Sequence, residues 1–111
     1  MKKINWAVEE AVALMNLYIE NDSKIPVDAN KVKKLSNTLK KRAERLNLDI
    51  DEKFRNVAGL NMQLACIHYV ATDGKEGLSG ASELFYDTYK LYLTDKKMFL
   101  RIYDDFSKIY Q

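Results

Sequence analysis

The sequence contains few of the residues on which metal-binding or β-rich proteins depend. Its 111 residues include one cysteine, one histidine, one proline and four glycines. A structural zinc site needs about four Cys or His ligands, so one of each cannot complete it. A multi-strand β fold needs a turn every few residues, for which four glycines and one proline are too few. We therefore expect an all-α protein that binds no zinc.

Two further absences suggest where the chain resides. Because Cys66 is the only cysteine, an internal disulfide is impossible and a reducing compartment suits the chain. The sequence has no run of about eighteen apolar residues and no charged-then-apolar leader, so we expect neither a membrane span nor a secretory signal. The expected location is the cytoplasm of a bacterium or of a phage's host cell. The composition, 47% hydrophobic and 31% charged, predicts one helical domain over residues 1–111.

Catalytic arrangements are also missing. His68 is the sole histidine and lies in a largely apolar segment, while Cys66 falls on a face that should be buried, where a thiol is unreactive. The adjacent carboxylates Glu9 and Glu10 do not face one another on a helix. Nucleophilic catalysis needs a nucleophile beside a base that a third group orients, and no such set is recognisable. We expect a protein without enzymatic activity, cofactor or metal.

Five segments show the 3.6-residue apolar period of amphipathic helices. Asn5, Asp28, Ser79 and Asp95 are the expected N-caps of the first, second, fourth and fifth helices, because their side-chain oxygens can accept backbone hydrogen bonds. The third segment, 57–71, has two apolar stripes, so we expect it to be the central, most buried helix. A very short loop joins the last two helices. The predicted fold is a compact all-α bundle of five helices, with a helix-turn-helix-like central part and a C-terminal antiparallel helix hairpin.

Positive charge is concentrated in one third of the chain. Residues 24–55 contain ten Lys or Arg and five Asp or Glu, a local charge of +5, whereas the whole chain carries +2. Lys31, Lys34, Lys41 and Arg45 follow one face of the second helix. This pattern favours either an anionic partner or a merely solvated helix face.

Residues 32–71 form a helix, a connector and a helix, the order found in helix-turn-helix DNA-binding proteins. In those proteins the N-terminal end of the later helix enters the major groove, where Arg and Asn make bidentate contacts to guanine and adenine. Two features count against this mode: the later helix is apolar nearly all round, and the connector of about ten residues is longer than usual. The candidate base contacts are Arg55, Asn56, Asn61 and Gln63, and the candidate phosphate contacts are Lys34, Lys41 and Arg45.

Two short strings resemble a known module. Residues 54–64 read FRNVAGLNMQL, residues 72–79 read TDGKEGLS, and Trp6 and Glu9-Glu10 precede them. Over residues 6–94 this pattern resembles the small N-terminal helical module of HNH-type endonucleases and related restriction or prophage proteins, and the first three helices also resemble Myb/SANT-type domains. The resemblance implies a module that supports DNA recognition or assembly. The His-Asn-His metal site of the nuclease half is missing here, so cleavage is not implied.

The aromatic residues suggest a second hypothesis. Eight of the twelve lie in the last two predicted helices. A helix hairpin buries about one stripe per helix, so either some rings stay exposed at a protein interface, where tyrosine is favoured, or all of them wrap a tall core. An exposed set would suit a homodimer, or a phage-encoded inhibitor of a host defence nuclease, of the anti-CRISPR or anti-restriction type. The candidate interface residues are Tyr86, Tyr89, Tyr103 and Tyr110.

Overall fold

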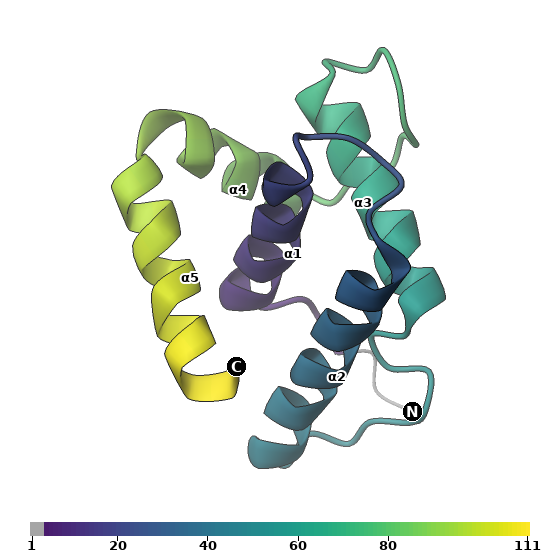
Figure 1. Ribbon diagram of the computed structural model, residues 1–111, viewed down its shortest axis with the longest axis vertical. Helices are drawn as coiled ribbons and strands as arrows, with labels where there is room; N and C mark the ends of the chain where they lie inside the picture. The colour runs from purple at the N-terminus through teal and green to yellow at the C-terminus, as the bar shows by residue number, and fades with distance from the viewer. Residues whose placement is uncertain (1–3) are drawn as a thin grey trace.

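The computed structural model describes residues 4–111 and confirms the all-α prediction. Its elements are α1 (Val8–Glu20), α2 (Ala29–Arg45), α3 (Val57–Ala71), α4 (Glu83–Thr94) and α5 (Lys96–Tyr110). Figure 1 shows α1 in the middle, with α2 and α3 on one side and α4 and α5 on the other. None of the helices in the described part of the chain is long and apolar enough to cross a membrane.

The most buried helix is α1, and the prediction that α3 would take this place was wrong. Helix α1 contacts each of the other four helices. Its segment 11–15 is at most 2% exposed, whereas Met62 on the second apolar stripe of α3 is 54% exposed. The apolar period of a helix identifies faces that can be buried, but the packing of the other helices decides which face is covered.

Two of the predicted N-caps are confirmed. Asp28 caps α2, because its Oδ1 accepts the backbone N–H groups of Asn30 at 2.8 Å and Lys31 at 3.2 Å. Asp95 caps α5 and accepts the backbone N–H of Met98 at 3.2 Å. These carboxylates satisfy backbone donors that a helix leaves unpaired in its first turn.

The other two predicted N-caps were wrong. Helix α1 begins after Ala7 rather than Asn5, and the Glu10 side chain accepts the Ala7 backbone N–H at 3.0 Å. Helix α4 begins after Ser82 rather than Ser79. In α1 a carboxylate within the first turn supplies the acceptor, so the N-cap itself needs no polar side chain.

The loop between α3 and α4 folds back onto α3. The backbone N–H of Leu78 donates to the carbonyl of Ala65 at 3.0 Å. Gly77 has φ +91°, and a Cβ added there would lie 2.4 Å from the Ala65 carbonyl oxygen and 2.6 Å from the Tyr69 nitrogen. Both the backbone angle and the close approach require glycine at this position.

The last two helices are joined through Asp95 alone, as the expected short connection requires. Figure 1 shows that α5 turns away from the end of α4 and runs beside α1. Its C-terminal end reaches α2, where Nη1 of Arg45 donates to the carbonyl of Ile109 at 2.9 Å. Helices α1, α2 and α5 are therefore neighbours, although the sequence separates α5 widely from the other two.

Candidate nucleic-acid interface

Arg55, predicted to contact a base, is instead packed inside the bundle. Its side chain is 9% exposed. Nε donates to Oε2 of Glu10 at 3.0 Å, and Nη2 donates to Oε1 of Glu10 at 3.1 Å. The guanidinium carbon lies 4.3 Å from the centre of the Trp6 ring and 4.4 Å from that of Phe54. These internal contacts occupy the guanidinium, so we remove Arg55 from the predicted base contacts.

The prediction that Asn56 contacts a base is corrected in the same way. It is the N-cap of α3, and its side-chain oxygen accepts the backbone N–H of Gly59 at 2.8 Å. A bidentate contact to adenine needs both the oxygen and the amide nitrogen of this side chain, and the oxygen is already used. The Arg-Asn pair therefore stabilises the start of α3.

A second arginine of the basic segment is also internal. Arg42 is 8% exposed and forms salt bridges with Glu9 and Glu10. Two of the ten basic residues in segment 24–55 thus neutralise carboxylates of α1. The residues that carried the family resemblance, including Trp6, the Glu pair, Arg55 and Gly77, make contacts that hold helices and loops together.

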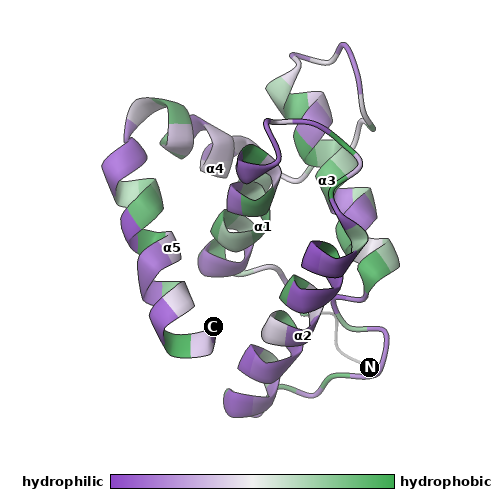
Figure 2. Cartoon of the chain, viewed as in Figure 1, coloured by the Kyte–Doolittle hydropathy of each residue, from purple (hydrophilic) through white to green (hydrophobic). Residues whose placement is uncertain are grey.

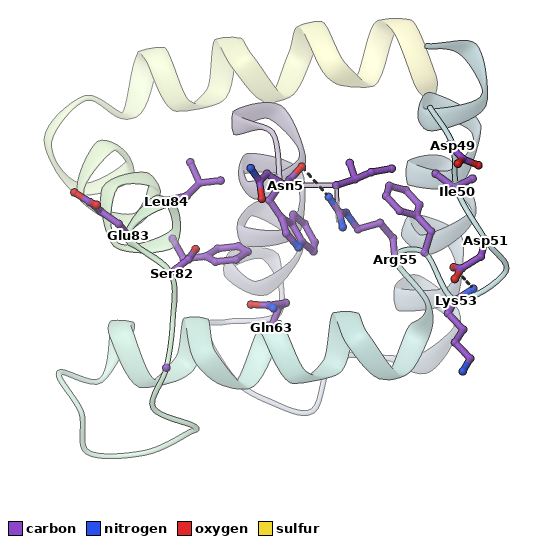
Figure 3. Close-up of a pocket in the computed structure, with 15 residues that line it drawn as sticks. Asn5, Asp49, Ile50, Asp51, Lys53, Arg55, Gln63, Ser82, Glu83 and Leu84 are labelled. Atoms are coloured by element: carbon purple, nitrogen blue, oxygen red, sulfur yellow. Dashed lines mark hydrogen bonds between the residues drawn. The ribbon is translucent and has the colours of Figure 1, made fainter. Parts of the chain in front are cut away.

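The remaining candidate base contacts do not form a common surface with the lysines. Asn61 is exposed on α3. Gln63 lines an open cleft of about 730 Å³ beside Trp6 and the start of α4, which Figure 3 shows. Asp49, Asp51 and Glu83 also line this cleft. These three carboxylates outnumber Lys53 at the same walls, and Arg55 is paired with Glu10, so this cleft is a poor site for a phosphate backbone.

A second depression, which we call the basic groove, lies between α1, α2 and α5. It has a volume of about 470 Å³ and is lined by Lys31, Lys34 and Lys41 of α2 together with Tyr103 and Tyr110 of α5. Two predicted phosphate contacts and two predicted interface tyrosines thus meet in one place. From the sequence alone, the lysines favour nucleic-acid binding and the tyrosines favour the competing protein interface.

The lysines of the basic groove are exposed and are not neutralised by salt bridges within the described residues. Lys31, Lys34 and Lys41 are exposed, and within residues 4–111 none of their ammonium groups forms a salt bridge. Glu20 is the one acidic side chain among the residues that line the groove. Figure 2 shows hydrophilic colour along much of α2. Because the three lysines outnumber this acidic side chain, the groove attracts an anionic ligand.

The tyrosines form the α5 wall of the basic groove. Tyr103 is half-buried, and its hydroxyl donates to the side-chain oxygen of Gln111 at 3.2 Å. Burial, followed by the charge of Glu20, raises the pKa of Tyr103 above its ordinary value. The Arg45 guanidinium carbon lies 5.4 Å from the centre of the Tyr110 ring. Arg45, the third predicted phosphate contact, therefore stands next to this wall.

The other two candidate interface tyrosines lie outside the basic groove. Tyr86 is 46% exposed on α4. Tyr89 is half-buried, packs against the hydrophobic core and has its ring centre 6.3 Å from that of Tyr92. The four predicted tyrosines thus divide into two pairs on different helices, and only the α5 pair adjoins the lysines.

Lys31 was absent from the predicted contact set although it belongs to the basic groove. It precedes Lys34 by three residues, and residues three or four apart share a helix face. That spacing was a sufficient signal on α2. No sequence signal indicated that Tyr103 would lie opposite the lysines of α2, because the contact between these two helices depends on how α5 packs.

The single histidine belongs to a chain of hydrogen bonds that runs from the buried Tyr18 to the exposed Glu76. Nδ1 of His68 is hydrogen-bonded to the Tyr18 hydroxyl at 2.7 Å, and Nε2 is hydrogen-bonded to Oε1 of Glu76 at 2.8 Å. This chain ties the loop after α3 to the core. Burial raises the pKa of the Cys66 thiol, which disfavours the reactive thiolate. Among residues 4–111 no group of three or more His, Cys, Asp or Glu residues is placed to hold a metal ion.

Comparisons of this chain with protein-family models, with curated proteins and with solved structures found no match.

Proposed function

We propose that this chain is a non-enzymatic module that binds nucleic acid, in a prophage or restriction-defence context, through the basic groove. The observation that carries the proposal is the convergence of three exposed lysines of α2 with two tyrosines of α5. Ammonium groups contact phosphates, and aromatic rings add contacts to sugars or bases. The resemblance to the HNH-associated module supports DNA as the nucleic acid.

The proposed mode differs from that of a helix-turn-helix protein. Arg55 and Asn56 at the start of α3 are committed to internal contacts, so base reading by this helix end is not part of the proposal. Binding instead rests on phosphate contacts from Lys31, Lys34 and Lys41. Such contacts orient a nucleic acid without reading its sequence, so we expect weak sequence preference.

The test is a titration of fluorescently labelled DNA, in duplex and in single-stranded form, at two salt concentrations. Three phosphate contacts release about two to three counterions, so affinity should fall roughly 20- to 40-fold between about 50 and 200 mM salt. Replacing two of the groove lysines, Lys34→Gln with Lys41→Gln, should lower affinity at low salt and reduce the dependence on salt.

A matched control is the double variant Lys90→Gln with Lys97→Gln. Both lysines are exposed on α4 and α5 and lie outside the basic groove, and the change in net charge is the same. Equal losses of DNA affinity in the two double variants would show that binding depends on net charge alone. Absence of binding to either form of DNA at low salt would overturn the proposal.

A second candidate function is binding to a protein, as in the inhibition of a host defence nuclease. The observation that favours it is the exposure of two large side chains on one face of α4, Tyr86 at 46% and Leu93 at 63%. These residues are seven apart and therefore lie on the same helix face. A protein that copurifies at moderate salt and is lost with Tyr86→Ser and Leu93→Ser would support this function.

A further inference from the structure

The shape of the basic groove bears on which form of nucleic acid can use it. Its lysines come from α2 and its tyrosines from α5, so cations stand on one wall and aromatic rings on the other. A volume of about 470 Å³ is within the range of small-ligand sites, which suits one or two nucleotides and not the width of a duplex.

We propose that the basic groove binds a single-stranded segment of nucleic acid, with a base against the tyrosine wall and the neighbouring phosphates on the lysines. This inference rests on the proposed function and specifies its ligand. In a duplex the base faces are stacked on one another, so the tyrosine rings of the groove could reach only base edges and phosphates. In a single strand the base faces are available, and stacking on aromatic rings is the common mode of binding without sequence preference.

The charges of the tyrosine wall fit this ligand. The phenol of Tyr103, which lines the groove, is uncharged at neutral pH, as tyrosine ordinarily is, so the ring does not repel a phosphate. Arg45 lies against Tyr110 and adds a cation where the strand would leave the groove. A positively charged groove next to aromatic rings is the combination found in proteins that bind single strands.

The decisive experiment compares three labelled ligands with the full chain at low salt. They are a single strand of about ten nucleotides, the duplex of the same sequence, and an abasic strand with the same number of phosphates. We expect the single strand to bind roughly tenfold or more tightly than either of the others, because only it offers free base faces. Equal or tighter binding of the duplex, or equal binding of the abasic strand, would overturn the inference.

Variants of the tyrosine wall separate stacking from charge. Tyr103→Leu should lower affinity for the single strand roughly tenfold and leave affinity for the abasic strand unchanged, and Tyr103→Phe should restore the loss because it keeps the ring. An unaltered affinity in Tyr103→Leu, with its helical content intact, would contradict the role of the ring. The proposed function fails separately, through the absence of binding to all three ligands.

Discussion

The carboxylate of Glu10 and the guanidinium of Arg55, 45 residues apart in sequence, form a buried pair with two hydrogen bonds of 3.0 and 3.1 Å. The Glu10 side chain is 1% exposed and also lies 3.8 Å from Arg42. This pair fixes the connector before α3 against the start of α1. It also removes from the surface the arginine that the sequence offered as a base contact.

We expect Arg55→Ala to lower the free energy of unfolding by about 3 kcal/mol. The substitution leaves the buried Glu10 carboxylate with the Ala7 backbone N–H and a longer contact to Arg42 as its remaining partners, and breaking one side of a buried pair costs roughly 3–5 kcal/mol. Urea unfolding followed by circular dichroism measures the change. Lys53→Ala, an exposed residue in the same connector, serves as the control and should stay within about 0.5 kcal/mol of wild type. Equal midpoints for the two variants would contradict the role of the pair.

Asn56→Ala should cost about 1 kcal/mol of stability, because it removes the side-chain acceptor that caps α3. Its affinity for DNA should equal that of wild type under conditions in which both proteins are folded. Asn61→Ala provides the comparison, since Asn61 is exposed inside α3 and makes no cap. A loss of DNA affinity in either variant at full folding would return these residues to the binding surface.

Two of the three glycines in the loop after α3 offer a matched pair of substitutions. Both have positive φ, +91° for Gly77 and +106° for Gly80, but an added Cβ meets backbone atoms only at Gly77. Gly80→Ala therefore measures the cost of the backbone angle, about 1–2 kcal/mol. Gly77→Ala should cost at least about 1 kcal/mol more, because the loop must move away from α3. Thermal unfolding compares the two variants. A similar loss of stability at both positions would show that the close approach of Gly77 to α3 does not contribute to the cost.

Stability should decline at high pH through Tyr18. Burial raises the pKa of Tyr18 to about 12, and the nearby Tyr89 and Glu76 add to the effect. In the unfolded chain the phenol ionises near pH 10, so below that pH its contribution to stability is fully present. Between about pH 10 and 12 the unfolded chain loses the proton first, and roughly 2–3 kcal/mol is lost.

Urea unfolding across this pH range in wild type and in Tyr18→Phe isolates the contribution. The variant loses the bond to His68 and should start from a lower stability, by about 1–3 kcal/mol. Its decline with pH should then be shallower than that of wild type, because the other tyrosines titrate in both proteins. If the stability of both proteins declined in parallel with pH, the decline would come from groups other than Tyr18.

The five helices were predictable because the signals that define them are local. An apolar period of 3.6 residues and a capping carboxylate act over three or four residues, so the second and fifth helices and their caps Asp28 and Asp95 followed from the sequence. The predicted bounds of α3 agree with the structure for the same reason. The first cap was missed because the acceptor comes from Glu10, three residues inside the helix.

Which basic residues face solvent was decided by tertiary structure alone. Arg55 and Lys34 both lie in the segment of charge +5, yet one pairs with a carboxylate of α1 and the other lines the basic groove. Charge and spacing along the chain do not distinguish them, because an ion pair between distant residues forms only once the helices have packed. The meeting of the α2 lysines with Tyr103 has the same origin: the sequence determined each helix face, and the packing of α5 beside α1 and α2 brought two of these faces together.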